Sequence, residues 1–176
     1  MAPTAIVVPF HDGPAVVTAH RRALTSDGAD RMPAHVTLIY PFVDDADLAD
    51  DEFRRLHGVL AAFAPFDVTF ATFARFDGQP PGLYLEPEPA GPFFAMIAAL
   101  AEEFPAFPPF GGVHETVIPH LTLGYTEDAK TLRAVEADVG RHLPVRARVD
   151  EVAVMEHGAD GWRPREHIAL FAPEGV

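Results

Sequence analysis

The stretch that decides the fold runs from His35 to Tyr40 and reads H-V-T-L-I-Y, and it recurs as H-L-T-L-G-Y from His120 to Tyr125. The two copies match at His, Thr, Leu and Tyr without a gap and stand about half the chain apart. Composition alone predicts about 0.04 chance copies of His-x-Thr-Leu in a chain of this make-up. The two copies therefore indicate an internal repeat, which has to be examined before any single motif.

Each copy of the motif is expected to form a strand. Because residues two apart in a strand point to the same face, His35 and Thr37 look one way while Val36 and Leu38 look the other. His120 and Thr122 repeat this layout. If the alternation continues to the end of each strand, Tyr40 and Tyr125 point to the apolar face, which predicts core packing rather than stacking on a base.

The elements around the motifs repeat in the same order: a motif strand, a helix, and then two strands. We expect strands over Ala5–Phe10, Val36–Phe42, Phe66–Ala74, Leu83–Glu86, Ile118–Tyr125, Val145–Met155 and Trp162–Phe171. A shift in alternation predicts a bulge near Asp150 and Glu151 in the sixth of these strands. Helices are expected from Asp12 to Gly28, from Asp44 to Leu60, from Gly91 past Leu100, and over Glu127–His142.

This pattern predicts an α+β fold with two duplicated antiparallel-sheet units, helices on the outside and a central cleft. Residues 1–176 would form a single bilobal domain, with lobes over about 1–90 and 91–176 that exchange a strand or a helix. The Pro/Gly-rich connection from Pro105 to Gly112 is the expected lobe junction.

Composition limits the possible partners. The 176 residues include 13 Lys and Arg against 26 Asp and Glu, which gives a formal net charge of −13. Such a surface repels polyanions, so binding of long nucleic acid is not expected. The absence of Cys excludes disulfides and thiolate zinc sites. No targeting or membrane segment is evident in the sequence, and we expect a soluble, cytoplasmic monomer.

The histidine and threonine of each motif copy suit a reaction at a phosphodiester. If the two halves face each other, two imidazoles and two hydroxyls converge on one cleft. Displacement at phosphorus needs a base on one side and an acid on the other, and His can supply both because its unperturbed pKa is near 6.5. Threonine hydroxyls can donate hydrogen bonds to the non-bridging oxygens. Which histidine would be the base stays open at this stage.

Together, the paired motifs, their spacing and the H-V-T-L-I-Y-P-F context resemble the 2H phosphoesterase superfamily, which includes 2′-5′ RNA ligases and cyclic nucleotide phosphodiesterases. The resemblance implies a bilobal α+β fold, a metal-independent site without a cofactor, and action on 2′,3′-cyclic phosphates or related nucleotide esters. It assigns His35, Thr37, His120 and Thr122 to the catalytic positions. The acidity of this chain favours a mononucleotide or short oligonucleotide over a long RNA.

Several alternatives accompany this interpretation. Arg163 and Arg165 share one face of the last strand, where they could clamp a phosphate or could form a solvated outer face. Arg75 is a weaker candidate of the same kind. His114 with His120 suggests a metal site, although zinc needs three or more close ligands. The chain could also be a non-catalytic nucleotide-binding module or a 2′-5′ RNA ligase that acts on RNA ends.

Overall fold

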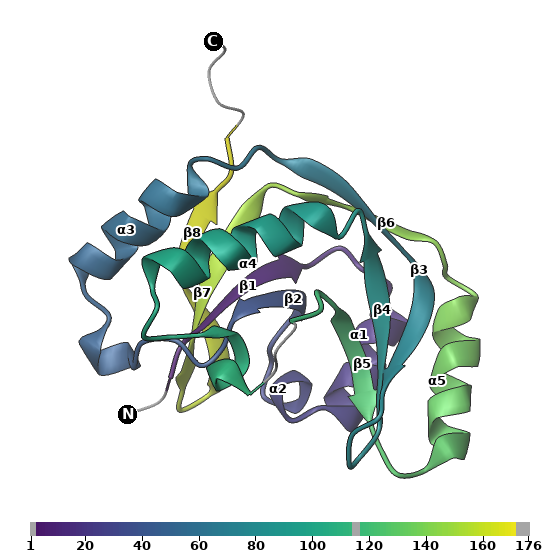
Figure 1. Ribbon diagram of the computed structural model, residues 1–176. Coiled ribbons are helices and arrows are strands. Elements are labelled where there is room, and N and C mark those ends of the chain that lie inside the picture. Colours follow the sequence, from purple (N-terminus) through teal and green to yellow (C-terminus); the bar gives the residue numbers. More distant parts are fainter. Residues whose placement is uncertain (1–2, 114–116, 172–176) are drawn as a thin grey trace.

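The computed structural model describes residues 3–113 and 117–171. Within these ranges the strands form two four-stranded antiparallel sheets with the orders β2-β1-β7-β8 and β5-β4-β3-β6 (Figure 1). The strands are β1 (Ala5–Phe10), β2 (Ala34–Ile39), β3 (Phe66–Phe76), β4 (Gly82–Glu88), β5 (Leu121–Tyr125), β6 (Val145–Val149), β7 (Glu151–Gly158) and β8 (Gly161–Ala169). The α-helices are α1 (Ala15–Leu24), α2 (Ser26–Ala29), α3 (Asp50–Leu60), α4 (Gly91–Glu103) and α5 (Ala129–Gly140), with 3₁₀ turns at Asp45–Asp47 and Pro109–Gly112.

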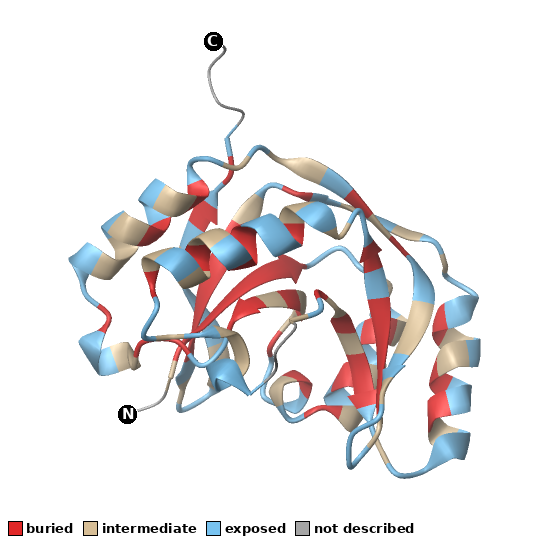
Figure 2. Cartoon of the chain, in the orientation of Figure 1, coloured by how far each residue is buried: buried red, intermediate tan, exposed pale blue. Residues whose placement is uncertain are grey.

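One hydrophobic core joins the two sheets to the helices that cover them. It includes Val8 and Leu38 from the first sheet and Phe70 and Leu85 from the second. The rings of Phe10 and Phe70 meet edge to face at 5.1 Å between centroids. Figure 2 shows buried residues along the strands and on the inner sides of the helices, while the outer helical faces are exposed. The α+β class, with antiparallel sheets and outer helices, is confirmed.

Each sheet draws strands from both halves of the chain. The first sheet combines β1 and β2 with β7 and β8, and the second combines β3 and β4 with β5 and β6. Strands from the two ends of the sequence therefore pair directly, as β1 does with β7. The division into lobes near residue 90 stays a prediction.

Val145–Met155 is not one bulged strand, as the sequence had suggested. Its first part, β6, pairs with β3, whereas its second part, β7, pairs with β1 and β8 in the other sheet. The chain passes between the sheets at Asp150, whose carbonyl accepts a hydrogen bond from the Leu170 amide at 2.7 Å. The shift in alternation reflects this change of sheet, because each part buries its own apolar face.

The helix expected from Asp12 to Gly28 is in fact two helices. α1 ends at Leu24, and Thr25 caps α2 by accepting a hydrogen bond from the Gly28 amide at 2.9 Å. The Thr25 hydroxyl donates in turn to the Arg21 carbonyl at 2.8 Å. One threonine thereby ends the first helix and starts the second, which turns the chain toward β2.

Both motif strands contain a bulge at the same leucine. The register of β1 with β2 passes from Thr37 to Ile39, so Leu38 has no partner of its own. The register of β4 with β5 passes from Thr122 to Gly124 and skips Leu123 in the same way. A bulge changes the phase of the alternation, which turns the following side chains to the opposite face.

The expected core packing of Tyr40 and Tyr125 is therefore wrong. Each tyrosine is 39% exposed, and both line the hollow that the histidines also line. The bulge is the physical reason, because it places the tyrosine on the same face as the histidine and threonine that precede it.

No helix in the described ranges is both long enough and apolar enough to cross a lipid bilayer.

Candidate functional site

A cleft of about 500 Å³ lies between the two motif strands. His35 and Thr37 of β2 enter it from one sheet, while His120, just before β5, and Thr122 of β5 enter it from the other. The structure thus brings the four sequence-predicted residues to one hollow. The remaining lining comes from β1, α2, the β7–β8 hairpin and the 3₁₀ turn after α4: Pro3, Ala5, Val7, Ser26, Asp27, Asp30, Met32, Tyr40, Phe110, Tyr125, His157 and Trp162.

The two histidines are held by the same backbone contact. His35 Nδ1 donates to the Pro33 carbonyl at 2.8 Å, and His120 Nδ1 donates to the Ile118 carbonyl at 2.6 Å. A carbonyl oxygen only accepts, so the hydrogen bond assigns the proton to Nδ1 in each ring. Nε2 is consequently the atom that can accept or donate a proton in the cleft.

An ion pair between a buried arginine and a half-buried aspartate connects the two motifs. Arg21 of α1 is 1% exposed. Its Nη1 donates to the Thr122 carbonyl at 2.6 Å, and its Nη2 donates to Asp27 Oδ2 at 2.5 Å. Asp27 Oδ2 also lies 3.9 Å from His35 Nδ1. One guanidinium therefore ties the second motif strand to the carboxylate beside the first histidine.

This surrounding holds His35 in its neutral form. The side chain is 12% exposed, and burial together with the positive charge of Arg21 lowers the pKa of His35 to about 4, against the opposing effect of Asp27. Burial of Asp27 would raise its carboxyl pKa, but the positive charge of Arg21 and the hydrogen bond that Arg21 donates lower the pKa below its usual value. At neutral pH the first motif thus presents an uncharged imidazole beside a compensated ion pair.

Sequence reasoning missed the residues that hold His35. Arg21 follows Val17 by four residues, so it falls on the apolar stripe of α1. An arginine on that stripe is the one sequence signal that could have identified it, because a charged residue is rarely buried without a partner.

Aromatic side chains line both sides of the histidine pair. On one side the rings of Tyr40 and Trp162 meet edge to face at 6.1 Å. On the other side Phe76 lies edge to face with His120 at 4.7 Å, and Phe110 is stacked on His120 at 6.1 Å. A second hollow of about 500 Å³ adjoins the cleft there and shares Phe110, His120 and Tyr125 with it.

Trp162 reaches the cleft because β8 is also bulged. The pairing of β7 with β8 skips Arg165, so residues before and after it alternate out of phase. Unbroken alternation along β8 would place Trp162 on the same face as Ile168. Instead, Ile168 belongs to the main core, whereas Trp162 packs on the separate cluster around Met155.

Arg163 and Arg165 do not line the cleft. Arg163 pairs with Glu156 at 2.5 Å, and Arg165 pairs with Glu156 at 3.0 Å and with Asp45. Burial would raise the pKa of Glu156, but the hydrogen bonds that Arg163 and Arg165 donate to its carboxylate lower it. Arg75 pairs with Glu136 of α5 at 2.8 Å. These three arginines are thus engaged by carboxylates outside the cleft.

Among the described residues, no group of three or more His, Asp and Glu side chains is arranged to hold a metal ion. His114, the partner that the metal alternative gave to His120, lies outside the described residues.

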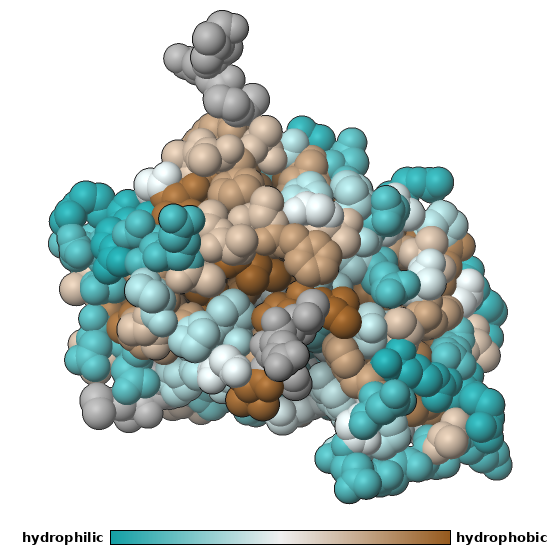
Figure 3. Space-filling view, in the orientation of Figure 1, coloured by the Kyte–Doolittle hydropathy of each residue, from teal (hydrophilic) through white to brown (hydrophobic). Residues whose placement is uncertain are grey.

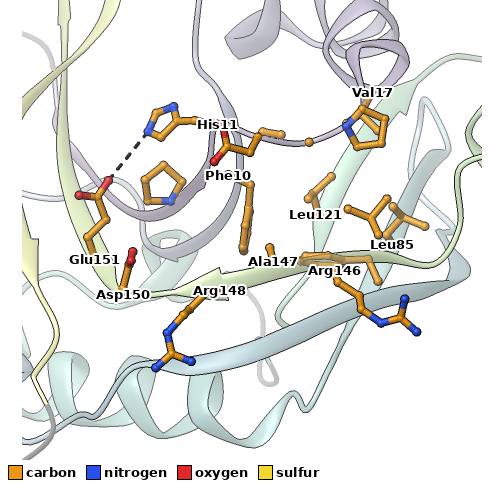
Figure 4. A pocket seen from close by; sticks show the side chains of 17 residues that line it. Phe10, His11, Val17, Leu85, Leu121, Arg146, Ala147, Arg148, Asp150 and Glu151 are labelled. Carbon is orange, nitrogen blue, oxygen red and sulfur yellow. Dashed lines mark ion pairs between the residues drawn. The ribbon is translucent and has the colours of Figure 1, made fainter.

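Another pocket, of about 360 Å³, opens where β1, α1 and β6 meet, and Figure 4 shows it at close range. Its inner wall is apolar and includes Phe10, Leu85 and Leu121, while Arg146 and Arg148 point away from that wall. Neither motif histidine lines it. The cleft is consequently the stronger candidate for acid-base chemistry.

Comparison with known proteins shows which family shares this arrangement. The model of the 2′-5′ RNA ligase superfamily matches residues 8–161. Among solved structures, TT0787 of Thermus thermophilus is similar with a TM-score of 0.65 at 17% identity, covering 98% of this chain and 100% of that one. LigT of Escherichia coli in its apo form gives 0.56 at 14% identity, with 97% and 98% covered. Usb1 of Kluyveromyces marxianus gives 0.55 at 11% identity, with 95% and 97% covered. No curated protein matched the chain.

Proposed function

The chain belongs to the 2′-5′ RNA ligase superfamily, and from that premise we propose that it is a metal-independent phosphoesterase that opens a 2′,3′-cyclic phosphate or a related nucleotide phosphodiester. Membership supports a phosphoesterase or RNA-end-processing role in general. One observation carries the finer proposal: two histidines, each fixed through Nδ1 to a backbone carbonyl, present Nε2 to the same cleft. The similar LigT was solved in complexes with 3′-AMP and with phosphate.

We assign the roles of the two histidines from the different surroundings of their rings. In this proposal His35, held neutral by burial and Arg21, is the general base, and His120 is the general acid on the leaving-group side. Thr37 and Thr122 donate their hydroxyl hydrogens to the non-bridging oxygens and stabilise the charge that gathers there.

The proposed step balances as a hydrolysis. His35 Nε2 takes a proton from water while the water oxygen forms a bond to phosphorus. The bond from phosphorus to one ribose oxygen breaks, and His120 Nε2 gives its proton to that oxygen. The product is a phosphomonoester with a free ribose hydroxyl, and proton exchange with solvent restores both rings.

Single substitutions test this proposal. The wild type and the variants His35→Ala, His120→Ala and Thr37→Val would be assayed with the four 2′,3′-cyclic mononucleotides in the presence of a chelator. Each histidine variant should lose roughly 10²- to 10⁴-fold in kcat, and Thr37→Val roughly 10²-fold. His142→Ala, a change of an exposed histidine beyond α5, serves as the matched control and should keep wild-type turnover.

The same assay separates the alternatives. Wild-type turnover in either histidine variant would overturn the catalytic roles. Binding of cyclic nucleotides without turnover by the wild type would identify a binding module instead. Activity that needs added metal and disappears with the chelator would contradict a metal-independent site. In a second assay with RNA fragments, joining of RNA ends without hydrolysis would indicate a ligase.

A further inference from the structure

The cleft and its adjoining hollow have no cationic wall. All 13 Lys and Arg lie in the described ranges, and none of them lines either hollow. Arg21 stands behind the cleft and is matched by Asp27 at 2.5 Å. Arg31 follows Asp30 directly but lines two other hollows. The positive charge available to a phosphate is therefore that of a protonated histidine.

Carboxylates line both sides of the histidine pair, and Asp27 lies beside His35 itself. Asp30 lines the side of the cleft that holds Trp162, and its Oδ2 is 3.2 Å from His157 Nε2. Asp77, which is exposed, lines the adjoining hollow beside Phe76. The surface outside is acidic as well, with a net charge of −13. A group that extends from the phosphate to either side therefore finds aromatic rings and a carboxylate in the lining.

These surroundings suit one kind of anion. A phosphodiester carries a single negative charge, which one protonated histidine balances, and its nucleoside parts are uncharged and can pack on the aromatic walls. A terminal phosphate adds close to two negative charges at pH 7.5. The cleft offers that group carboxylates and no guanidinium or ammonium to receive it.

Building on the proposed function, we infer that the cleft selects a monoanionic phosphodiester flanked by uncharged nucleosides and discriminates against substrates that carry a further phosphate, with Asp30 and Asp77 as the specificity-determining residues. Figure 3 shows that on the face over α4 apolar residues gather in the middle and hydrophilic residues surround them. In a water-like medium, two unit charges about 7 Å apart change an equilibrium roughly threefold, so a dianion loses close to tenfold.

The test compares 2′,3′-cyclic AMP with its 5′-phosphorylated form at pH 7.5 and low salt. We expect kcat/KM to be about tenfold lower for the phosphorylated substrate. Asp30→Asn or Asp77→Asn, whichever lines the side that the 5′ end enters, should raise the ratio of kcat/KM for the phosphorylated substrate to kcat/KM for the unphosphorylated one at least threefold. Glu102→Gln, which removes an exposed carboxylate on α4, is the matched control and should change neither value.

Calorimetric titration measures the same selection as a difference in affinity between the two ligands, without turnover. It would use the His35→Ala variant, which lacks the proposed base but keeps His120, if the wild type cleaves the ligands, and the wild type if it does not. Equal or tighter binding of the phosphorylated ligand, or no effect of both Asp variants on the ratio, would overturn the selection. If the protein binds the monoanionic ligand more tightly but hydrolyses neither ligand, the proposed function is overturned and the selection stands.

Discussion

At the scale of single residues, the two motif histidines share a backbone contact but differ in their surroundings. His35 is largely buried near the charge of Arg21, which lowers its pKa to about 4. His120 lies among the rings of Phe76, Tyr84 and Phe110. Two residues with the same motif position and the same tautomer can therefore take opposite roles in a proton transfer, because the protein environment rather than the residue type decides which form is present.

The pH dependence of the reaction follows from the pKa of His35. A base with a pKa of about 4 stays unprotonated well below pH 6.5, so kcat/KM should hold as the pH falls and decline only through about pH 4, tenfold per unit below it. Steady-state rates from pH 3.5 to 9 at constant ionic strength would measure this acidic limb of the pH–rate profile. Circular dichroism would show that the fold persists. An acidic limb near 6.5 would contradict the assignment of His35 as the base.

Two substitutions should move that limb in opposite directions. Arg21→Met removes a positive charge that lowers the pKa of His35, so the limb should move to higher pH. Asp27→Asn removes a negative charge that raises it, so the limb should move to lower pH. Asp27→Asn leaves the buried guanidinium of Arg21 without its counter-charge, which costs about 3 kcal/mol of stability. Arg21→Met leaves a carboxylate whose side chain is 32% exposed and should cost less. A purely structural role for the pair would lower the rate without moving the limb.

At the scale of elements, the structure shows which features the sequence could predict. That His35 and Thr37 lie on the same face depends on local alternation, which a strand imposes whatever its partners are. The bulges at Leu38, Leu123 and Arg165 depend on how neighbouring strands pair, and the passage between sheets at Asp150 depends on where each part of the strand finds its core. Neither is encoded by local spacing, so alternation alone places Tyr40 and Trp162 on the wrong faces.

The packing of α1 on β5 is the element contact that brings Arg21 to the second motif. Gly124 permits it, because a Cβ added there would stand 2.6 Å from Leu24 Cβ. Gly124→Ala should push α1 away from β5, weaken the bond from Arg21 to the Thr122 carbonyl, and lower both kcat and the free energy of unfolding. The loss of stability should be about 1–3 kcal/mol, measured by urea denaturation.

A matched substitution and a double variant check this interpretation. Gly58→Ala on α3 meets no atom within 4 Å and should stabilise the helix by up to about 1 kcal/mol. Adding Leu24→Ala to Gly124→Ala removes part of the clash, so the two changes should cost less together than the sum of their separate effects. An alanine at 124 that leaves stability and kcat unchanged would show that the close approach is not required.

At the scale of the whole molecule, the net charge of −13 acts on every anion that approaches the cleft. Because the sequence places twice as many acidic as basic residues on one chain, the long-range field repels a nucleotide until it reaches the histidines. The acidity therefore limits how much charge and length a substrate can bring, while the cleft itself determines what chemistry the substrate undergoes. A long RNA would extend many phosphates over a surface that repels them.

This repulsion predicts an unusual response to salt. Raising the ionic strength from 0.01 M to 0.15 M shortens the Debye length from roughly 30 to 8 Å, which screens the field outside the cleft. kcat/KM for 2′,3′-cyclic AMP should therefore rise, by about two- to fivefold, whereas a protein that binds RNA through many phosphate contacts loses affinity over the same range. Sucrose at matched osmolality controls for effects of water activity and should leave the rate unchanged. A fall in kcat/KM with added salt would mean that the substrate meets a positive surface, against the distribution of charge around this cleft.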